Sequence, residues 1–145
     1  MKALLQRVRH ASVEVEGHCV GEIGPGLLVF LGLDRGDDRV VGSRMLDKLL
    51  AYRLFADAAG RMNSSVSDVA GGVLLLSQFT LSADTRRGLR PSFSSALPPA
   101  EAEPLYQWML VQLRERHPVV AAGQFGADMQ VSLVNDGPVT FLLEL

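Results

Sequence analysis

Two short apolar runs restrict the fold of this chain more than any other feature of its sequence. They are "GLLVFLGL" at residues 26–33 and "GGVLLL" at residues 71–76. Each run has the length of one strand, and a strand without polar residues on either side is typical of a sheet that is buried on both faces. Both runs are far shorter than the roughly 18 apolar residues of a membrane-spanning helix. The sequence therefore predicts a covered sheet in a chain that has no membrane contact.

Successive strands are expected over residues 6–33, up to the end of the first apolar run. Valine and glutamate alternate in "VEVE", which is the pattern of a strand with one buried face. Gly17 and His18 are placed to turn the chain, and Pro25 followed by Gly26 fits the central pair of a type II turn. The segment therefore predicts strands that are joined by tight turns.

Strand-like segments continue along the chain, although they are shorter. We expect a short strand at residues 52–55, a turn-rich surface at residues 56–72, and a buried strand within residues 71–81. Two further strands are expected to close the chain, one before and one after the dipeptide Gly137–Pro138.

Two segments have the periodicity of amphipathic helices. The first, residues 37–52, opens with two aspartates, and its apolar face is formed by Val41, Met45, Leu46, Leu49 and Leu50. The second begins after two prolines and runs through residues 100–116, with an apolar side formed by Leu105, Trp108, Met109 and Leu113.

The order of these elements predicts the architecture. Strands, helix, strands, helix and strands follow one another, with too many tight turns for a purely parallel sheet. We expect a mixed α/β fold in which two mixed or antiparallel β-sheets pack together, with the two helices on one side. Residues 1–145 are expected to form a single domain, because 48% of the residues are hydrophobic and no linker or repeat interrupts the chain.

Charge and cysteine content limit the partners and the compartment. The net charge of −2 is not that of a dedicated nucleic-acid-binding protein, so any contact with nucleic acid must be local. Cys19 is the one cysteine, which excludes an intramolecular disulfide; we expect it to be a small apolar filler in a strand. The first residues meet charge too early for a signal peptide, so we expect a cytoplasmic protein.

The sequence lacks the common motifs of cofactor and metal chemistry. There is no phosphate-binding G-x-x-x-x-G-K loop, no H-E-x-x-H and no G-x-S-x-G. His10, His18 and His117 lie far apart in the sequence, and we interpret each as a surface or turn residue rather than a catalytic base. We therefore expect no cofactor and no metal.

Polar residues follow the second apolar run, where the chain leaves the core. In "SQFTL", residues 77–81, Ser77 and Thr80 carry hydroxyls and Gln78 offers both a donor and an acceptor. Such a strand end is a common place for a site, but it is also typical of side chains that satisfy their own backbone. The next loop carries Arg86, Arg87 and Arg90, which suit either a phosphate contact or a solvated loop.

The segment "VNDGPVTF", residues 134–141, raises a separate question. Here Pro138 is followed by valine rather than glycine, so the pattern of a type II turn is incomplete. Proline cannot donate a hydrogen bond to a strand neighbour, so Pro138 is expected at a strand start or a sheet edge. The residue pattern alone does not explain why Gly137–Pro138 stands there.

The motifs "SQFTL", "RRGLRPSF" and "VSLVNDGPVTF", in this order, resemble the D-aminoacyl-tRNA deacylase family, and the resemblance spans the whole chain. It implies a homodimer of mixed sheets with covering helices, in which a cis Gly137–Pro138 bond of one subunit enters the active site of the other. There the dipeptide acts as a chirality filter: a D side chain points to open space, an L side chain collides, and glycine passes. Arg7 is implied to brace this dipeptide.

The resemblance also assigns roles to residues. It implies a catalytic segment of Ser77, Gln78, Phe79 and Thr80, and a substrate-binding set of Gly137, Pro138, Arg7, Phe125 and Met129. Without the resemblance, Phe125 and Met129 are interpreted as core residues. Two mechanisms remain open: Thr80 as a nucleophile, or backbone N–H groups near Phe79 and Thr80 that stabilise the oxyanion while the 2'-hydroxyl of the terminal adenosine assists water. We prefer the second, since no base is visible beside Thr80.

The implied activity is hydrolysis of the ester bond of D-aminoacyl-tRNA, and of mischarged glycyl-tRNA. The implied partner is the 3' acceptor end of tRNA. Our own hypothesis for Arg86, Arg87 and Arg90 is contact with phosphates of the acceptor stem. One alternative is a non-catalytic dimeric module that binds RNA acceptor ends. Another is an ordinary serine or threonine esterase that acts on small esters and needs no RNA.

Overall fold

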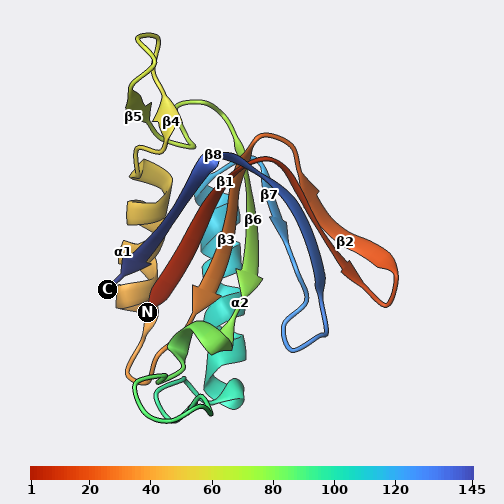
Figure 1. The fold of residues 1–145 in the computed structure, drawn as a ribbon, viewed down its shortest axis with the longest axis vertical. Coiled ribbons are helices and arrows are strands. Elements are labelled where there is room, and N and C mark those ends of the chain that lie inside the picture. The colour runs from red at the N-terminus through yellow and green to blue at the C-terminus, as the bar shows by residue number, and fades with distance from the viewer.

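The chain begins with three antiparallel strands, β1 (Lys2–Val15), β2 (His18–Ile23) and β3 (Gly26–Gly32). The computed structural model describes all residues, 1–145 (Figure 1). β1 pairs with β3 through its first half and with β2 through its second half, so both neighbours lie along the same edge of β1. The strands expected before the first apolar run are therefore present.

One six-stranded sheet contains all the long strands. Its order is β2-β1-β3-β6-β7, with β6 (Gly72–Ser77) and β7 (Val120–Ala122) parallel to β3, and β8 (Gln130–Glu144) pairs with the other edge of β1. Only β4 (Phe55–Ala56) and β5 (Met62–Ser64) form a separate two-stranded sheet. The mixed α/β class is confirmed, but the prediction of two packed sheets is wrong, because β1 pairs along both of its edges and joins the strands into one sheet.

Both helices cover the same face of this sheet. In Figure 1, α1 (Arg39–Ala51) and α2 (Pro99–Arg116) lie behind the strands. The larger core cluster joins helical residues to alternate residues of β3 and β6: Leu27, Val29, Leu31, Val73, Leu75, Met45, Leu49 and Met109. This arrangement confirms the expected apolar faces of the helices.

The opposite face of the sheet has a core of its own, which contains no helical residue. The intervening strand residues Leu28, Leu74 and Leu76 are fully buried in it. The sheet curls until its two ends meet, so that a Cβ at Gly21 of β2 would lie 2.7 Å from the Ala122 carbonyl oxygen of β7. Because the sheet folds over this face, the two apolar runs are buried on both sides, as predicted.

Two predicted turns differ from the structure. The first uses Glu16 and Gly17, with φ of 51° and 77°, rather than Gly17 and His18. The second is not a type II turn, because Gly26 is a strand residue without the positive φ that such a turn requires. A Cβ at Gly26 would lie 2.0 Å from the Gly72 carbonyl oxygen, so glycine is needed there for the close approach of β3 and β6.

Several boundaries were also misplaced. The predicted strand at residues 52–55 is reduced to β4, and the expected surface at 56–72 contains β5. The two closing strands are one strand, β8, which runs through Gly137–Pro138, and β7 was not anticipated.

Two predicted single-residue environments need correction. Cys19 lies in β2 but is exposed, so it fills no core space. His117 is only 4% exposed, not a surface residue, because it closes α2 and its Nε2 lies 2.7 Å from the Gly71 carbonyl oxygen. No helix is long and apolar enough to cross a membrane.

Candidate active site

The segment after β6 leaves the sheet abruptly. Ser77 still pairs with Leu31 of β3, and the Gln78 amide donates to the Leu31 carbonyl at 2.8 Å. The chain then enters a short 3₁₀-helix, η1 (Phe79–Ser82), rather than continuing as the predicted strand. As a result, Ser77 and Gln78 are half-buried, whereas Phe79 and Thr80 are exposed.

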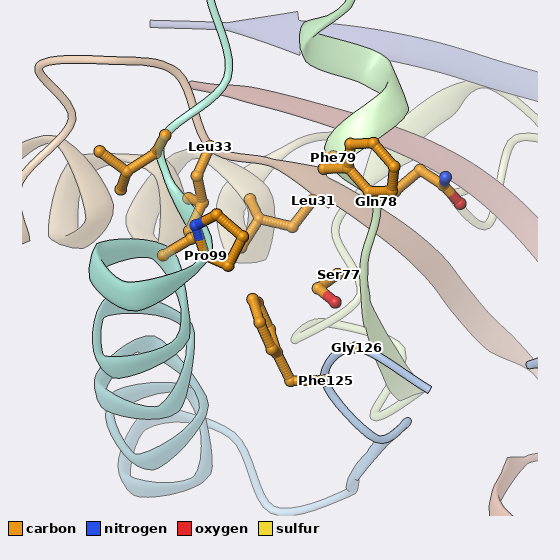
Figure 2. A pocket seen from close by; sticks show the side chains of 10 residues that line it. Leu31, Leu33, Ser77, Gln78, Phe79, Pro99, Phe125 and Gly126 are labelled. Atoms are coloured by element: carbon orange, nitrogen blue, oxygen red, sulfur yellow. The ribbon is translucent and has the colours of Figure 1, made fainter. Parts of the chain in front are cut away.

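Two pockets flank this segment. The first has a volume of about 210 Å³ and lies between the segment and the start of α2, with Pro99 on one side, Ser77 and Phe79 on the other, and Phe125 between them (Figure 2). The second, of about 260 Å³, contains Met129 in its wall. Both pockets are lined by Ser77, Gln78, Phe79 and Gly126. The structure therefore brings together the predicted SQFT segment with Phe125 and Met129.

No acid or base side chain accompanies the Thr80 hydroxyl. Its hydrogen-bond partner is the Gln78 side chain, whose Nε2 donates to Oγ1 at 2.5 Å. A carboxamide is not a base, and the buried His117 lies beside Gly71, at the other end of β6. No group of three or more His, Cys, Asp or Glu side chains is arranged to hold a metal ion.

The backbone supplies the free polar groups of this site. The Leu81 and Ala83 amides bond to carbonyl oxygens of Gln78 and Thr80, but the Phe79 and Thr80 amides have no acceptor in the protein. The first N–H groups of any helical turn lack a partner within the helix. Two donors therefore remain available beside the pockets for an oxygen that carries negative charge.

Arg7 holds the second predicted motif. Its Nε donates to the Asp136 carbonyl at 3.1 Å and lies 3.4 Å from the Asp136 carboxylate, and its Nη1 donates to the Leu54 carbonyl at 2.6 Å. The side chain of Arg7 is only 16% exposed. These contacts place the guanidinium directly against the segment that contains Gly137.

The Gly137–Pro138 bond is cis, and both residues are exposed. Gly137 has φ of 134°, and a Cβ there would lie 2.6 Å from Val139 Cγ2 and 3.0 Å from Arg7 Nη2. No other residue type fits this backbone without displacing the valine or the arginine.

Within the chain, the two motifs lie apart. Arg7 pairs with Leu27 of β3, whereas Ser77 pairs with Leu31. Four residues along a strand correspond to about 13 Å, and Gly137 lies beyond Arg7 on the far side of β1. The structure therefore does not bring Arg7, Gly137 and Pro138 to the pockets of the same chain.

Comparison with known proteins places these motifs in a family. The family model for D-Tyr-tRNA(Tyr) deacylase matches residues 4–144. The chain belongs to this family. Its relatives include D-aminoacyl-tRNA deacylases of Stutzerimonas stutzeri, 62% identical over 99% of both chains, and Cellvibrio japonicus, 61% identical over 100% of this chain and 99% of that relative. The predicted family and the predicted enzyme class, a hydrolase, are confirmed.

Two solved structures agree with this deacylase fold. A protein named c-Myc DNA Unwinding Element Binding Protein has a TM-score of 0.96 and 41% identity, and covers 100% of this chain and 99% of its own. A probable eukaryotic D-amino acid tRNA deacylase has a TM-score of 0.85 at 16% identity, with 99% and 98% covered, which shows the fold alone.

Two residues of the deacylase motifs were missed from sequence. The Asn135 side chain donates to the carbonyls of Arg7 and Val139 and accepts from the Val139 amide, and so closes the bulge around Gly137. The Asp136 carbonyl accepts a hydrogen bond from Arg7, and the Asp136 carboxylate forms an ion pair with the same side chain. An asparagine two residues before Gly137 was a usable signal, because Asn side chains often bond to nearby backbone in turns.

The three arginines of the loop differ from one another. Arg86 donates through Nε and Nη2 to the two carboxylate oxygens of Asp84, at 2.9 and 2.8 Å. This contact holds the pKa of the Asp84 carboxyl well below its usual range. Arg87 and Arg90 are exposed and have no hydrogen-bond or ion-pair partner in the protein. Only these two are free to meet a ligand.

Proposed function

We propose that this chain hydrolyses the ester bond of D-aminoacyl-tRNA, and of mischarged glycyl-tRNA, at the pockets beside Ser77, Gln78 and Phe79. The observation that carries the proposal is the pair of free amides at Phe79 and Thr80, next to two pockets and without an acid–base pair. The aminoacyl ester of tRNA is already reactive. Stabilisation of its oxyanion is therefore a sufficient task for such a site.

The proposed chirality filter is supplied in trans by the partner subunit of a homodimer. Gly137 and Pro138 are exposed and follow Asp136, whose carbonyl Arg7 binds, and they are too far from the pockets of their own chain to act there. β8 pairs with β1 on one edge only, and its exposed apolar side chains, such as Phe141 and Leu142, favour contact with a second subunit.

The filter works by pinning the α-ammonium group of the substrate. The carbonyl oxygens of Gly137 and Pro138 accept hydrogen bonds from this ammonium, each worth about 1.5–3 kcal/mol. The ester carbonyl is held beside Phe79 and Thr80, so the remaining directions on the α-carbon are determined. A D side chain then points to open space, an L side chain collides with the dipeptide, and glycine passes. Such steric rejection discriminates more strongly than pocket affinity alone.

The test is release of amino acid from matched D-tyrosyl-tRNA and L-tyrosyl-tRNA by the purified protein. We expect rapid release from the D form, slow release from the L form, and measurable release from glycyl-tRNA. Equal release from the D and L forms would instead indicate a general esterase. Binding of tRNA without release from either form would indicate a non-catalytic acceptor-end module.

Thr80→Ala separates the two mechanisms. If the amides and the 2'-hydroxyl of the terminal adenosine carry the reaction, Thr80→Ala is expected to lower kcat by less than about tenfold, because its hydroxyl only accepts from Gln78. A nucleophile would lose roughly 10⁴-fold or more. The complementary substrate carries D-tyrosine on a 2'-deoxy terminal adenosine. Hydrolysis of this substrate at the normal rate would contradict the preferred mechanism.

A further inference from the structure

An exposed aromatic pair lies at the edge of the pockets. Phe79 is 61% exposed and Phe93 is 40% exposed, and their ring centroids are 5.0 Å apart. Phe79 lines both pockets, whereas Phe93 lines neither. Phe93 therefore extends the site beyond the pocket wall that Phe79 forms. Core packing does not explain either ring, because both are exposed.

The loop that carries Phe93 is attached to the body of the protein on both sides. Asp84 and Ser92 exchange backbone hydrogen bonds of 2.7 and 3.0 Å. Further along, the Ser95 hydroxyl donates to the Ser82 carbonyl, and Arg35 Nε donates to the Ser94 carbonyl at 2.6 Å. Phe93 lies between these attachments, so its ring is presented from a fixed backbone.

The tip of the same loop presents two uncompensated positive charges. The Asp84 carboxylate binds Arg86, which leaves Arg87 and Arg90 exposed and without a partner. The chain as a whole has a net charge of −2, so this charge is local. Exposed arginines and an exposed aromatic ring on one loop are a combination that binds single-stranded nucleic acid, through phosphates and stacked bases respectively.

We propose that Phe93, Arg87 and Arg90 bind the single-stranded nucleotides that directly precede the terminal adenosine of the tRNA. In this arrangement the Phe93 ring stacks on the preceding base, and the two guanidinium groups contact the phosphates on its 5' side. Phe79 lines both pockets and the Phe93 ring lies 5.0 Å from it, so the base next to the terminal adenosine is the first one that Phe93 would meet. The inference rests on the proposed function for the position of the terminal adenosine.

Direct binding of uncharged tRNA is the first readout, because it does not depend on hydrolysis. Phe93→Leu is expected to weaken binding roughly tenfold through lost stacking. The double variant Arg87→Gln/Arg90→Gln is expected to reduce the slope of log Kd against log salt by about 1.4, from roughly 0.7 per phosphate on a single strand. Arg114→Gln is the matched control: it removes one exposed, unpaired arginine near the far end of α2, about 22 Å from Pro99.

Hydrolysis of two substrates is the second readout. D-tyrosyl-tRNA carries the preceding nucleotides, whereas D-tyrosyl-adenosine carries only the terminal nucleoside. We expect the loss of kcat/KM in Phe93→Leu to be roughly tenfold larger for the tRNA substrate than for the adenosine substrate. Equal losses for both substrates would overturn the proposal, because they would mean that Phe93 only supports Phe79.

The two readouts separate this inference from the proposed function. If the wild-type protein hydrolyses neither substrate but the variants lose tRNA binding, the proposed function fails and the nucleotide contacts stand. If hydrolysis is normal, and binding and salt dependence of the variants match those of wild type and Arg114→Gln, the nucleotide contacts are overturned and the proposed function stands.

Discussion

Mixing the subunits of two inactive variants is expected to restore deacylation. The first variant is Phe79→Pro, which removes an amide that has no partner in the protein. Gln78, with φ of −144° and ψ of 83°, lies outside the α region and so tolerates a following proline, and proline suits the first position of a helical turn. This variant should keep its fold and lose one of the two proposed oxyanion donors, together with the Phe79 ring that lines both pockets, with a loss of roughly 100-fold or more in kcat.

The second variant is Gly137→Ala, which damages the other motif. The added Cβ would lie 2.6 Å from Val139 Cγ2 and 3.0 Å from Arg7 Nη2, at a φ of 134° that L side chains rarely adopt. The dipeptide must therefore shift, and the proposed contacts with the substrate ammonium are lost. We expect a similarly large loss of activity in the homodimer of this variant.

If the filter acts in trans as proposed, one site of a mixed dimer combines both defects and the other combines neither. Random exchange of equal amounts makes half of the dimers mixed, so about one quarter of all sites are intact in a two-fold symmetric dimer. We expect release from D-tyrosyl-tRNA at about a quarter of the wild-type rate per site, measured after co-expression of differently tagged subunits. Tag-purified mixed dimers that stay inactive would show that the two motifs do not meet across the subunits.

Arg7→Ala is expected to have the second largest effect. The substitution removes two hydrogen bonds, to the Asp136 and Leu54 carbonyls, and one ion pair, all from a side chain that is 16% exposed. Release of D-tyrosine should fall roughly 100-fold, because the segment with Gly137 loses its brace. The free energy of unfolding should fall by about 2–3 kcal/mol, since two partly buried carbonyl groups lose a charged donor.

Arg9→Ala is the matched control for this experiment. Arg9 approaches the same Asp136 carboxylate at 3.6 Å, but its side chain is 76% exposed, and it donates no hydrogen bond to the segment. We expect its kcat/KM to stay within about twofold of wild type. Thermal unfolding of both variants separates loss of the brace from loss of the fold. Equal activity of Arg7→Ala and Arg9→Ala would exclude the bracing role.

The local sequence pattern was sufficient to predict burial where a residue's environment depends on its own helix or strand. The apolar face of α1 was predicted from its period, and Met45, Leu46 and Leu49 are buried as expected. The apolar runs of β3 and β6 likewise indicated burial on both faces. In each case one element alone decides which side chains point inward.

The sequence pattern was insufficient to predict a residue's environment where that environment depends on contact with a segment far away in the sequence. Gly26 was predicted to be a turn residue, but its true neighbour is Gly72, which is 46 residues away in the sequence. His117 was predicted to be at the surface, but the Gly71 carbonyl and the end of α2 enclose it. Neither contact leaves a periodic signal in the chain.

The sequence by itself therefore determined the two helices, the strands of the two apolar runs, the buried faces of these elements and the motifs that identify the family. Only the tertiary structure decided that the strands form one curled sheet, that the SQFT segment meets Phe125 and Met129, and that Gly137 lies apart from them. The physical reason is that periodicity reports on a single element, whereas strand pairing and pocket geometry depend on which elements meet. The packing of the whole chain determines which elements are in contact.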